Sequence, residues 1–444
     1  MYGHRTDILL VVEHSARELD IACALKYLLQ VRNHLSVQLA DSFQHTLALR
    51  RSVPSIVAYP FFYTSADPAI QQTLSLWRDA IYVNLTYEQI DNRFTRAIRA
   101  PKDAFVQKCV FHHVWSDSYA DYLQENGVPR NHIFVNGNPS YTLYQLPYSR
   151  YFATRDEIAR KHGLDLRKRW LFLPDSYGVA FNTDARWQSY IERGRSEAEV
   201  QEYRAFAQSS FREVVSWYHK AAQMPDVEVI VRPRPATPQS VFIKACVEAL
   251  GGIRPKFRII KEGSVREWVL TSDMVLSPYS TTLIEAAIAG KPIYMVAPRP
   301  FPEFVRSAWH DRVTKVDALS ALLDAVAQPE LPDNWRPLCH WAKDTMLSRG
   351  DAIANLADWL AQLCRQDATC ESSSSLTGSH SPAQIGWVDI MSETLKREGQ
   401  PLAQQWRRLA GKAALDVHEQ DVIRSRDIEM RLSKWAEVLS VIDV

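Results

Sequence analysis

The amino-acid sequence predicts an α/β protein with two Rossmann-like domains that face each other across a cleft, followed by a C-terminal helical segment. Three observations lead to this prediction. The chain has 444 residues, more than one hydrophobic core usually organises. Short, nearly continuous apolar runs alternate with helical patterns, which indicates parallel sheets covered on both faces. The alternation occurs twice, with a break near residues 148–161.

The first block, residues 1–150, is expected to form an N-terminal Rossmann-like domain. Its clearest helical pattern starts at Ser15 and Glu18, which are spaced for a capping box. Six apolar runs are expected to form its strands, at residues 8–12, 36–40, 55–61, 80–85, 112–117 and 133–139.

The second block, residues 151–330, repeats this style and is expected to form a second Rossmann-like domain. Closing helices are expected at residues 331–365, a Ser-rich linker at 366–386 and a helical tail at 387–444. The tail either packs on the main body or docks a partner. The expected strands of the second block lie at residues 170–175, 227–231, 257–261, 274–277 and 292–296.

The composition and the first apolar run argue against a nucleic-acid-binding, secreted or membrane-spanning protein. Lys and Arg total 52 against 51 Asp and Glu, so no bulk field favours nucleic acid, and any bound anion must be gripped locally. The six cysteines are scattered, which favours reduced thiols. The first apolar run is too short for a signal peptide or a membrane span. We therefore expect a cytoplasmic protein that works near the inner face of the membrane, with peripheral membrane association.

The stretch VEVIVRPRP, residues 227–235, places two arginines where a buried strand ends. In parallel sheets, ligands bind beyond the carboxyl ends of the strands. Alternation puts Arg232 and Arg234 on one side, and the prolines stiffen the exit from the strand. Two guanidinium groups presented in this way suit a phosphate or carboxylate. The alternative is a pair of surface arginines at a sheet edge.

Two further loops of the second block carry anion-binding patterns. In KEGSVREW, Gly263 and Ser264 precede a helix start, although a capping box with Glu267 explains them equally well. In SPYSTTLIEAAIAGKP, hydroxyl groups crowd the start of a helix and are expected to bind a nucleotide's phosphates. Glu285 either accepts two ribose hydroxyls or completes a capping box. The nucleotide-binding candidates of this second loop are Ser277, Tyr279, Ser280, Thr281, Thr282 and Glu285.

The string EAAIAGKP is similar to the nucleotide-binding segment of GT-B glycosyltransferases. Together with VVEHSARELD, YPFFYTSAD, GNPSY, LPDSYGVAFNTD, VRPRP and EGSVREW, it resembles the bacterial surface carbohydrate biosynthesis protein family over roughly residues 7–320. That family is similar in turn to capsule, polysialic acid and β-Kdo transferases. The resemblance implies a GT-B fold and sugar transfer, with the acceptor bound by residues 1–150 and the nucleotide-sugar donor by residues 151–330. Relatives usually carry histidine where this chain has Arg234, and that histidine helps them bind a cytidine nucleotide.

Candidate catalytic residues follow the first strand of each block. Asp175 follows the strand at 170–175, and Glu13 and His14 follow the strand at 8–12. Asp175 is expected to matter most, as base or nucleophile, with Glu13 supporting deprotonation of the acceptor. A turn residue or a helix-flanking loop explains them otherwise. Tyr63 and Glu88 lie in loops that could stack on and hydrogen-bond the acceptor sugar.

The expected reaction is transfer of a sugar from a nucleotide-sugar donor, such as CMP-Kdo or a related acidic sugar, to a lipid-linked or oligosaccharide acceptor of a bacterial surface glycan. No two aspartates have Asp-x-Asp spacing, so neither a metal nor another cofactor is expected. The alternatives are a sugar-nucleotide 2-epimerase with the same fold and a non-catalytic glycan- or nucleotide-binding protein.

Overall fold

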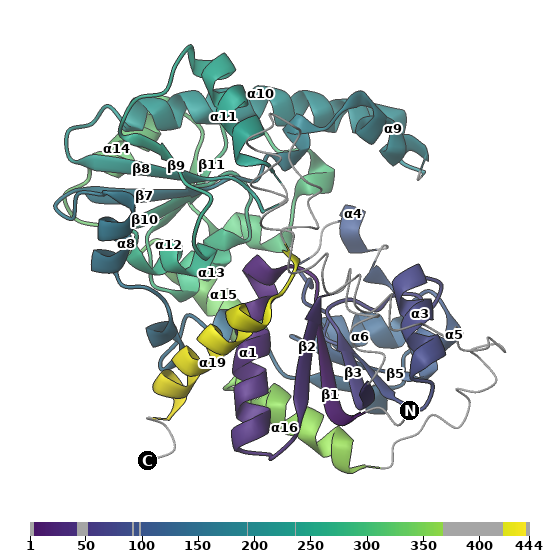
Figure 1. Ribbon diagram of the computed structural model, residues 1–444. Coiled ribbons are helices and arrows are strands. Elements are labelled where there is room, and N and C mark those ends of the chain that lie inside the picture. The colour runs from purple at the N-terminus through teal and green to yellow at the C-terminus, as the bar shows by residue number, and fades with distance from the viewer. Residues whose placement is uncertain are drawn as a thin grey trace, which may run out of the picture. The chain divides into compact units, whose positions relative to one another are not determined.

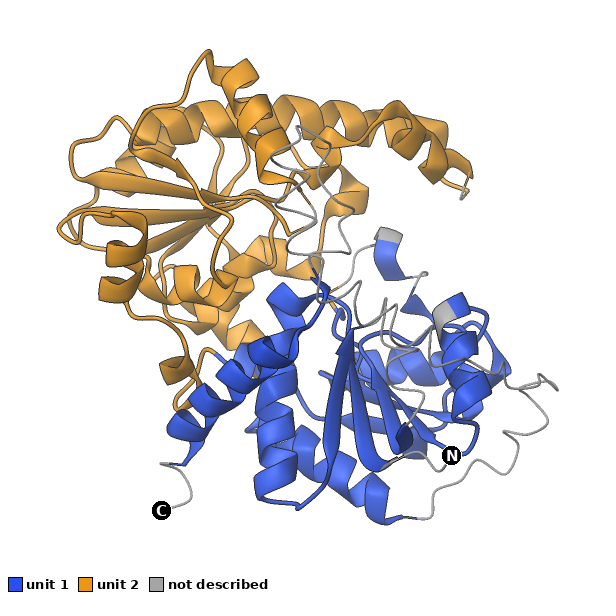
Figure 2. Cartoon of the chain, in the orientation of Figure 1, with its two compact units in different colours: residues 1–89, 95–143, 344–444 blue, residues 90–94, 144–343 orange. Residues whose placement is uncertain are grey.

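A computed structural model of the chain describes residues 4–41, 52–90, 93–96, 99–192, 194–235, 237–366 and 421–440. The chain divides into two compact units, shown in Figure 2. The first comprises residues 1–89, 95–143 and 344–444, and the second comprises residues 90–94 and 144–343. Apart from residue 366, the predicted linker lies outside the described residues, as do residues 387–420 of the predicted tail.

The described strands of the first unit form a six-stranded parallel sheet in the order β2-β1-β3-β4-β5-β6 (Figure 1). Each matches a predicted apolar run because a strand buried on both faces needs continuous apolar sequence. Their bounds are β1 (His4–Val12), β2 (Val37–Asp41), β3 (Ser52–Tyr59), β4 (Ile81–Asn84), β5 (Val110–Val114) and β6 (Ile133–Val135).

Helices bury both faces of this sheet. Leu9, Val57 and Tyr82 share one core with α3 (Pro68–Leu76) and α5 (Ala104–Lys108). α1 (Ser15–Val31) packs against α16 (Ala352–Arg365) and α19 (Ser425–Leu439), although both come from the far end of the sequence. The remaining described α-helices of this unit are α6 (Asp117–Glu125) and α7 (Pro139–Thr142), while α4 (Arg93–Arg96) spans the unit boundary.

The start of α1 corrects one prediction. The residue that caps this helix is His14, and no side chain caps it in the way predicted for Ser15. Instead the carboxylate of Glu18 reaches back, and its Oε2 accepts from the backbone N–H of Glu13 at 2.7 Å and of His14 at 3.3 Å. The helix begins one residue earlier than a capping box at Ser15 requires, and the Ser15 hydroxyl lies 3.5 Å from Oδ1 of Asp421 instead.

The described strands of the second unit form another six-stranded parallel sheet, in the order β12-β11-β10-β7-β8-β9. Five were predicted. The sixth, β12, has only two residues, so it leaves no periodic pattern in the sequence. Their bounds are β7 (Arg169–Pro174), β8 (Val227–Arg232), β9 (Phe257–Ile259), β10 (Met274–Ser277), β11 (Ile293–Val296) and β12 (Lys315–Val316).

The two faces of the second sheet have different covers. Leu171, Val229 and Leu276 share a core with residues of α10 (Glu197–Ala221), α11 (Gln239–Leu250) and α14 (Leu319–Ala327). On the other face, Trp268 of α12 (Val265–Thr271) stacks on Phe172 of β7, and α13 (Thr282–Ile288) packs beside α12. The other described α-helices are α8 (Arg155–His162), α9 (Asp184–Glu192) and α15 (Arg336–Met346), the last of which spans the unit boundary.

The cysteine prediction holds for four residues and is wrong for one. Cys23, Cys246, Cys339 and Cys364 are free thiols, whereas Cys109 is disulfide-bonded. Spacing alone did not distinguish Cys109 from the others. Within the described ranges, no helix combines the length and apolar character that crossing a membrane requires.

Candidate active site

The strand order of each sheet marks where a ligand is expected. In the second sheet β7 is flanked by β8 and β10, and in the first sheet β1 is flanked by β2 and β3. At such a central strand the strand order reverses, so the connections on its two sides run in opposite directions. In parallel sheets, ligands bind at the carboxyl ends of the strands at this point. The predicted residues Asp175 and Glu13 directly follow the two central strands.

Asp175 stands beside the end of β8. Its backbone N–H donates to the carbonyl of Arg232 at 2.9 Å, and its Oδ1 accepts from the N–H of Tyr177 at 3.0 Å. That second bond is the turn interaction considered as an alternative for this residue. Among the described residues, the buried Oδ2 finds no hydrogen-bond partner. Burial raises the pKa of Asp175 to about 6, against the opposing effects of the Tyr177 bond and the charge of Arg234.

Arg234 is exposed and lies over Gly178. A Cβ on Gly178 would stand 3.0 Å from Cδ of Arg234, so glycine lets this side chain approach the backbone closely. The charge of Arg234 acts on Asp175 and on Tyr279. Tyr279 itself packs edge-on against Tyr177, with ring centroids 5.5 Å apart, inside the core beneath α10.

Arg232 has different surroundings. It is 7% exposed, and one Nη donates to the carbonyl of Gly263 at 2.9 Å. Burial lowers the pKa of Arg232, while the nearby carboxylates of Glu267 and Glu285 oppose the shift. Within the described part of the chain, its buried Nε has no hydrogen-bond partner. The two arginines therefore act on separate groups, although alternation suggested that both would lie on one side.

The start of α12 forms the capping box that the sequence offered as an alternative. The backbone N–H of Ser264 donates to Glu267 at 2.9 Å, and the Ser264 hydroxyl accepts from the N–H of Arg266 at 3.2 Å. Gly263 has φ of 81°, a left-handed conformation that favours glycine. The predicted donor Ser264 is thus engaged inside the protein, while Gly263 accepts from Arg232 through its carbonyl.

Some hydroxyl groups in and beside the loop after β10 are buried in hydrogen bonds within the protein, and others lie near the surface. Ser277 is fully buried, and its hydroxyl donates to the carbonyl of Pro174 at 2.8 Å, joining β10 to β7. Ser280 donates to the hydroxyl of Thr282 at 3.0 Å and accepts from its N–H at 3.3 Å. Thr281 is exposed and flanks the start of α13 without a side-chain cap. Ser280 and Thr281 are the members of this loop nearest to solvent.

Glu285 does not complete a capping box with Thr282, since no side-chain cap forms at the start of α13. Its Oε2 instead accepts a hydrogen bond from the hydroxyl of Tyr144. Tyr144 was not predicted, because it lies 141 residues away from Glu285 along the chain. Glu285 is half-buried one turn into α13, with the charge of Arg232 nearby.

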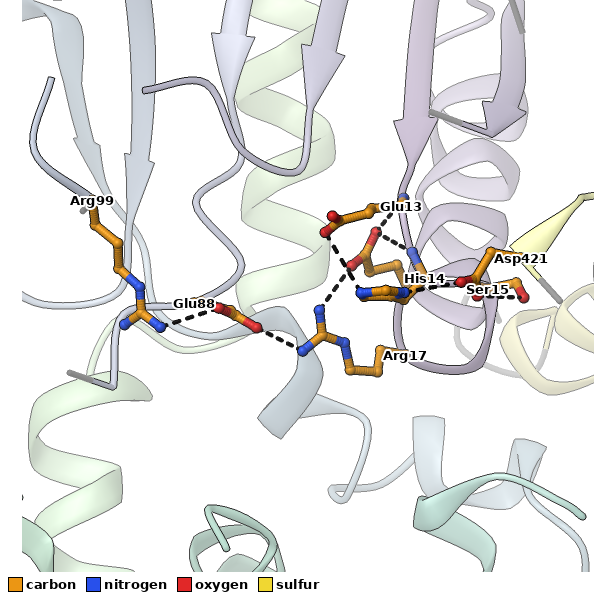
Figure 3. A network of polar contacts seen from close by, with 8 residues as sticks. Glu13, His14, Ser15, Arg17, Glu88, Arg99 and Asp421 are labelled. Atoms are coloured by element: carbon orange, nitrogen blue, oxygen red, sulfur yellow. Dashed lines mark hydrogen bonds and ion pairs between the residues drawn. The ribbon is translucent and has the colours of Figure 1, made fainter. Parts of the chain in front are cut away.

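In the first unit, Glu13 and His14 belong to a polar network at the end of β1 (Figure 3). His14 Nε2 lies 3.8 Å from a carboxylate oxygen of Glu13. His14 Nδ1 lies 3.0 Å from Oδ2 of Asp421, whose Oδ1 also accepts from the N–H of Ser15 at 3.1 Å. The hydrogen bond to Asp421 raises the pKa of His14, and burial raises the pKa of Glu13.

The predicted acceptor residues join the same network. Glu88 lies between Arg17, at 2.7 Å, and Arg99, at 3.1 Å, as Figure 3 shows. Tyr63 is close enough to Arg99, Glu88 and Glu13 for their charges to act on its pKa, which burial raises. Among the described residues, the Tyr63 hydroxyl lacks a hydrogen-bond partner. The structure therefore brings Glu13, His14, Tyr63 and Glu88 together.

A buried amide joins the two loops that carry the predicted acceptor residues Tyr63 and Glu88. Asn84, the last residue of β4, accepts from the N–H of Phe62 at 3.2 Å and of Thr86 at 3.1 Å through its Oδ1. Its Nδ2 donates to the carbonyl of Phe62 at 3.2 Å. These bonds join the loop after β3, which carries Tyr63, to the loop after β4, which carries Glu88.

Four residues that contact the predicted site residues were not predicted from the sequence: Arg17, Arg99, Tyr144 and Asp421. Arg17 lies one helical turn after Glu13, a spacing that could have indicated contact. Arg99 and Asp421 lie far from Glu13 in the sequence, so only the fold places them in this network. A group of three or more His, Cys, Asp or Glu residues suited to a metal ion does not occur in the described ranges.

No protein-family model matches the chain, and no curated protein matches it in sequence. Solved structures do match its fold. A variant of the wall teichoic acid polymerase TagF, solved with CDPG, is 13% identical, covers 82% of this chain and 89% of its own, and has a TM-score of 0.53. The UDP-GlcNAc 2-epimerase of Neisseria meningitidis bound to UDP-GlcNAc is 10% identical over 81% of this chain and 98% of its own, at 0.50.

A third match is S. aureus MnaA solved with UDP, which is 9% identical, covers 86% of this chain and 100% of its own, and has a TM-score of 0.50. At these identities the likeness is one of fold. The two six-stranded parallel sheets and this likeness define a GT-B-like protein. The fold is shared by glycosyltransferases and UDP-GlcNAc 2-epimerases.

Proposed function

We propose that the chain is a glycosyltransferase that moves a sugar from a nucleotide-sugar donor to a bacterial surface glycan. One observation carries the proposal: Glu13 and His14, both with raised pKa values, share a network with the paired charges of Arg17, Glu88 and Arg99 at the end of β1. A proton acceptor beside fixed polar groups is what activation of a sugar hydroxyl requires.

The donor is assigned to the second unit. Arg234 is exposed, and its guanidinium suits a phosphate oxygen or the carboxylate of an acidic sugar. Glu285 offers carboxylate oxygens for ribose hydroxyls. The nucleotides present in the solved structures of MnaA and of the Neisseria epimerase support a nucleotide ligand on this fold. CMP-Kdo or a related acidic sugar is proposed from the resemblance to surface carbohydrate biosynthesis proteins.

In the proposed transfer step, side chains of this chain take up the proton and stabilise the charge of the leaving group. Glu13 takes the proton of the acceptor hydroxyl, and the hydroxyl oxygen forms the new bond to the anomeric carbon. The bond from that carbon to the nucleotide's phosphate oxygen breaks, and its electron pair stays on the phosphate, where Arg234 stabilises the charge. Burial raises the pKa of Glu13, which makes it a better proton acceptor at neutral pH.

Asp175 is proposed to contact the transferred sugar. Its Oδ2 carries a lone pair that no described neighbour uses, and Arg234 lies beside it. Direct attack of the acceptor gives inversion, whereas attack by Asp175 followed by a second displacement gives retention. The anomeric configuration of the product distinguishes these two roles.

The acceptor is proposed to be a lipid-linked or oligosaccharide intermediate of lipopolysaccharide or capsule, with peripheral association of the protein at the membrane that carries it. The resemblance to transferases of such glycans supports this assignment. Tyr63, whose hydroxyl has no described partner, is proposed to hydrogen-bond the acceptor.

NMR of defined donors, incubated with and without an acceptor glycan, tests the proposal. Transfer predicts release of free nucleotide that depends on the acceptor and is reduced about 100-fold or more in Glu13→Gln. Release that is unchanged in Glu13→Gln would remove the role assigned to this residue. Donors that bind but never react would favour a non-catalytic binding protein.

A sugar-nucleotide 2-epimerase is the second candidate, because the Neisseria UDP-GlcNAc 2-epimerase shares the fold over 81% of this chain. An epimerase changes the donor in the absence of any acceptor. Appearance of a new epimer in the donor-only sample, without acceptor-dependent nucleotide release, would decide for it.

A further inference from the structure

The network at Glu13 includes a residue from the far end of the chain. Asp421 lies 407 residues after His14 and just before α19, and both of its carboxylate oxygens contact the start of α1. Oδ2 is 3.0 Å from Nδ1 of His14, while Oδ1 accepts from the backbone N–H of Ser15. Figure 3 shows Asp421 on one side of the His14 ring and Glu13 on the other.

The segment that carries Asp421 is docked on α1 by other contacts. Trp435 is fully buried, and its indole N–H donates to the carbonyl of Asp20 at 3.0 Å. Arg431 pairs with the carboxylate of Asp20, with Nε 3.0 Å from Oδ1. Ile423 and Leu439 are also fully buried. Because apolar burial holds the segment, its docking does not depend on Asp421 alone.

The contact with Asp421 fixes the chemistry of the His14 ring. A carboxylate accepts hydrogen bonds, so Nδ1 of the neutral ring must carry the proton. Nε2 then bears the lone pair, and it lies 3.8 Å from the Glu13 carboxylate. The charged groups that act on His14 are Asp421, Glu13 and Arg17, from the segment before α19, the end of β1 and α1.

We propose that Asp421 completes the acceptor side of the active site as the positioning residue that holds His14 by Nδ1 and presents Nε2 toward Glu13 and the acceptor hydroxyl. The inference rests on the proposed function, in which Glu13 and His14 share the network that activates the acceptor hydroxyl. The geometric part, that Asp421 sets the tautomer of this histidine, stands on the contacts alone.

The test uses the full-length protein and two variants. Asp421→Asn keeps the size of the side chain but removes its charge, and its amide can donate to Nδ1, which permits the opposite tautomer. Arg431→Gln removes the ion pair with Asp20 and leaves the carboxylate at His14 in place. This matched control reports any effect that comes only from weaker docking of α19.

The first readout is the nitrogen NMR of histidine-labelled protein, with His14→Gln used to assign the His14 signals. In wild type and in Arg431→Gln we expect the proton of the neutral ring on Nδ1. In Asp421→Asn we expect it on Nε2, together with a lower pKa for His14, because its principal hydrogen-bond acceptor is gone. An unchanged tautomer in Asp421→Asn would overturn the inference.

The second readout is the transfer rate. We expect kcat of Asp421→Asn to fall about 10- to 100-fold with little change in the acceptor KM, since the loss is one of proton-transfer geometry. Arg431→Gln should keep kcat within about threefold of wild type. Equal losses in the two variants would reduce the role of Asp421 to docking and would contradict the proposal.

The tautomer of His14 and the transfer rate can change independently, so the two readouts test the positioning role and the proposed function separately. If the tautomer changes as expected while His14→Gln transfers at the wild-type rate, Asp421 positions a ring that the reaction does not use, and the catalytic assignment of His14 is wrong. If His14→Gln loses transfer while Asp421→Asn changes neither tautomer nor rate, the function stands and the positioning role is excluded.

Discussion

The carboxylate of Glu88 accepts a hydrogen bond from Arg17, with Oε1 2.7 Å from Nη1. Its other oxygen is held by Arg99 at 3.1 Å. Glu88 was predicted to hydrogen-bond an acceptor sugar, yet both of its oxygens already have cationic partners. The residue therefore orders two arginines at the end of the first sheet, and it is these donors, with Glu88 between them, that an acceptor would meet.

Glu88→Gln is expected to impair acceptor binding more than stability. Its side chain is 39% exposed, and ion pairs of this kind contribute about 0–1 kcal/mol. We expect the free energy of unfolding to fall by at most about 1 kcal/mol, and the acceptor KM to rise about tenfold as Arg17 and Arg99 lose their alignment. Urea denaturation and steady-state kinetics measure the two effects.

Asp117→Asn is the matched control, because Asp117 pairs with Arg349 at an exposed position of the same unit. It should match the small stability change of Glu88→Gln and leave the acceptor KM unaltered. A KM that rises equally in both variants would contradict a specific role for Glu88.

Asp175→Asn is expected to abolish turnover and to change how stability depends on pH. Burial raises the pKa of Asp175 from an ordinary 3.8 to about 6. Because the folded pKa is the higher one, the stabilisation is complete below the unfolded pKa and is lost as pH rises through about 6. Relative to the variant, wild type should therefore lose roughly 1–3 kcal/mol of unfolding free energy between about pH 4 and 6.

Urea denaturation of both proteins across this pH range gives the difference directly, and the contribution of other groups such as Glu18 cancels. A stability difference that does not vary with pH would show that burial does not perturb Asp175. Wild-type turnover in Asp175→Asn would exclude it from the chemistry.

Substitution of Arg232 is expected to lower stability, whereas substitution of Arg234 is expected to lower nucleotide affinity. Arg232→Met removes a buried charged donor to the Gly263 carbonyl, so the free energy of unfolding should fall by about 2–3 kcal/mol. Arg234→Ala changes an exposed side chain and should alter stability by about 0.5 kcal/mol or less. Its nucleotide affinity should fall about 10- to 100-fold if it contacts phosphate. Calorimetric titration with CMP and UDP, with thermal denaturation of each variant, measures both; equal nucleotide affinity in wild type and Arg234→Ala would refute the phosphate contact.

Glu285 and Tyr144 provide a matched pair. Glu285→Gln should weaken nucleotide binding about tenfold, since a neutral amide oxygen is a weaker hydrogen-bond acceptor for ribose hydroxyls than a carboxylate oxygen. Tyr144→Phe removes the hydroxyl that donates to Glu285 and leaves the carboxylate intact, so its affinity should stay within about threefold. Titration with CMP and UDP compares them, and a greater loss in Tyr144→Phe would indicate that Tyr144 is the ligand.

The strands could be predicted because burial on both faces imposes continuous apolar sequence, as at residues 8–12 and 227–231. The two-residue strand β12 is too short to leave such a pattern. The packing of α16 and α19 against α1 was also beyond sequence reasoning, because helical periodicity records that a face is buried and not which element buries it.

The candidate site was predictable where the rule of carboxyl strand ends applies, as for Asp175 and Glu13. The rule places backbone positions, and side-chain direction depends on the fold. Arg232 and Arg234 are two residues apart, but Arg232 turns to Gly263 while Arg234 lies over Gly178. Asp421 could not be predicted, because nothing in the sequence relates it to His14.

Hydrogen exchange of the full-length protein, with and without saturating CMP or UDP, tests most directly whether the second unit binds a nucleotide at the carboxyl edge of its sheet. We expect protection in the loops after β7, β8 and β10, around Asp175, Arg234 and residues 278–285, and loss of that protection in Arg234→Ala. Protection confined to other segments, while the nucleotide binds, would show that the second unit does not bind it at this edge of the sheet.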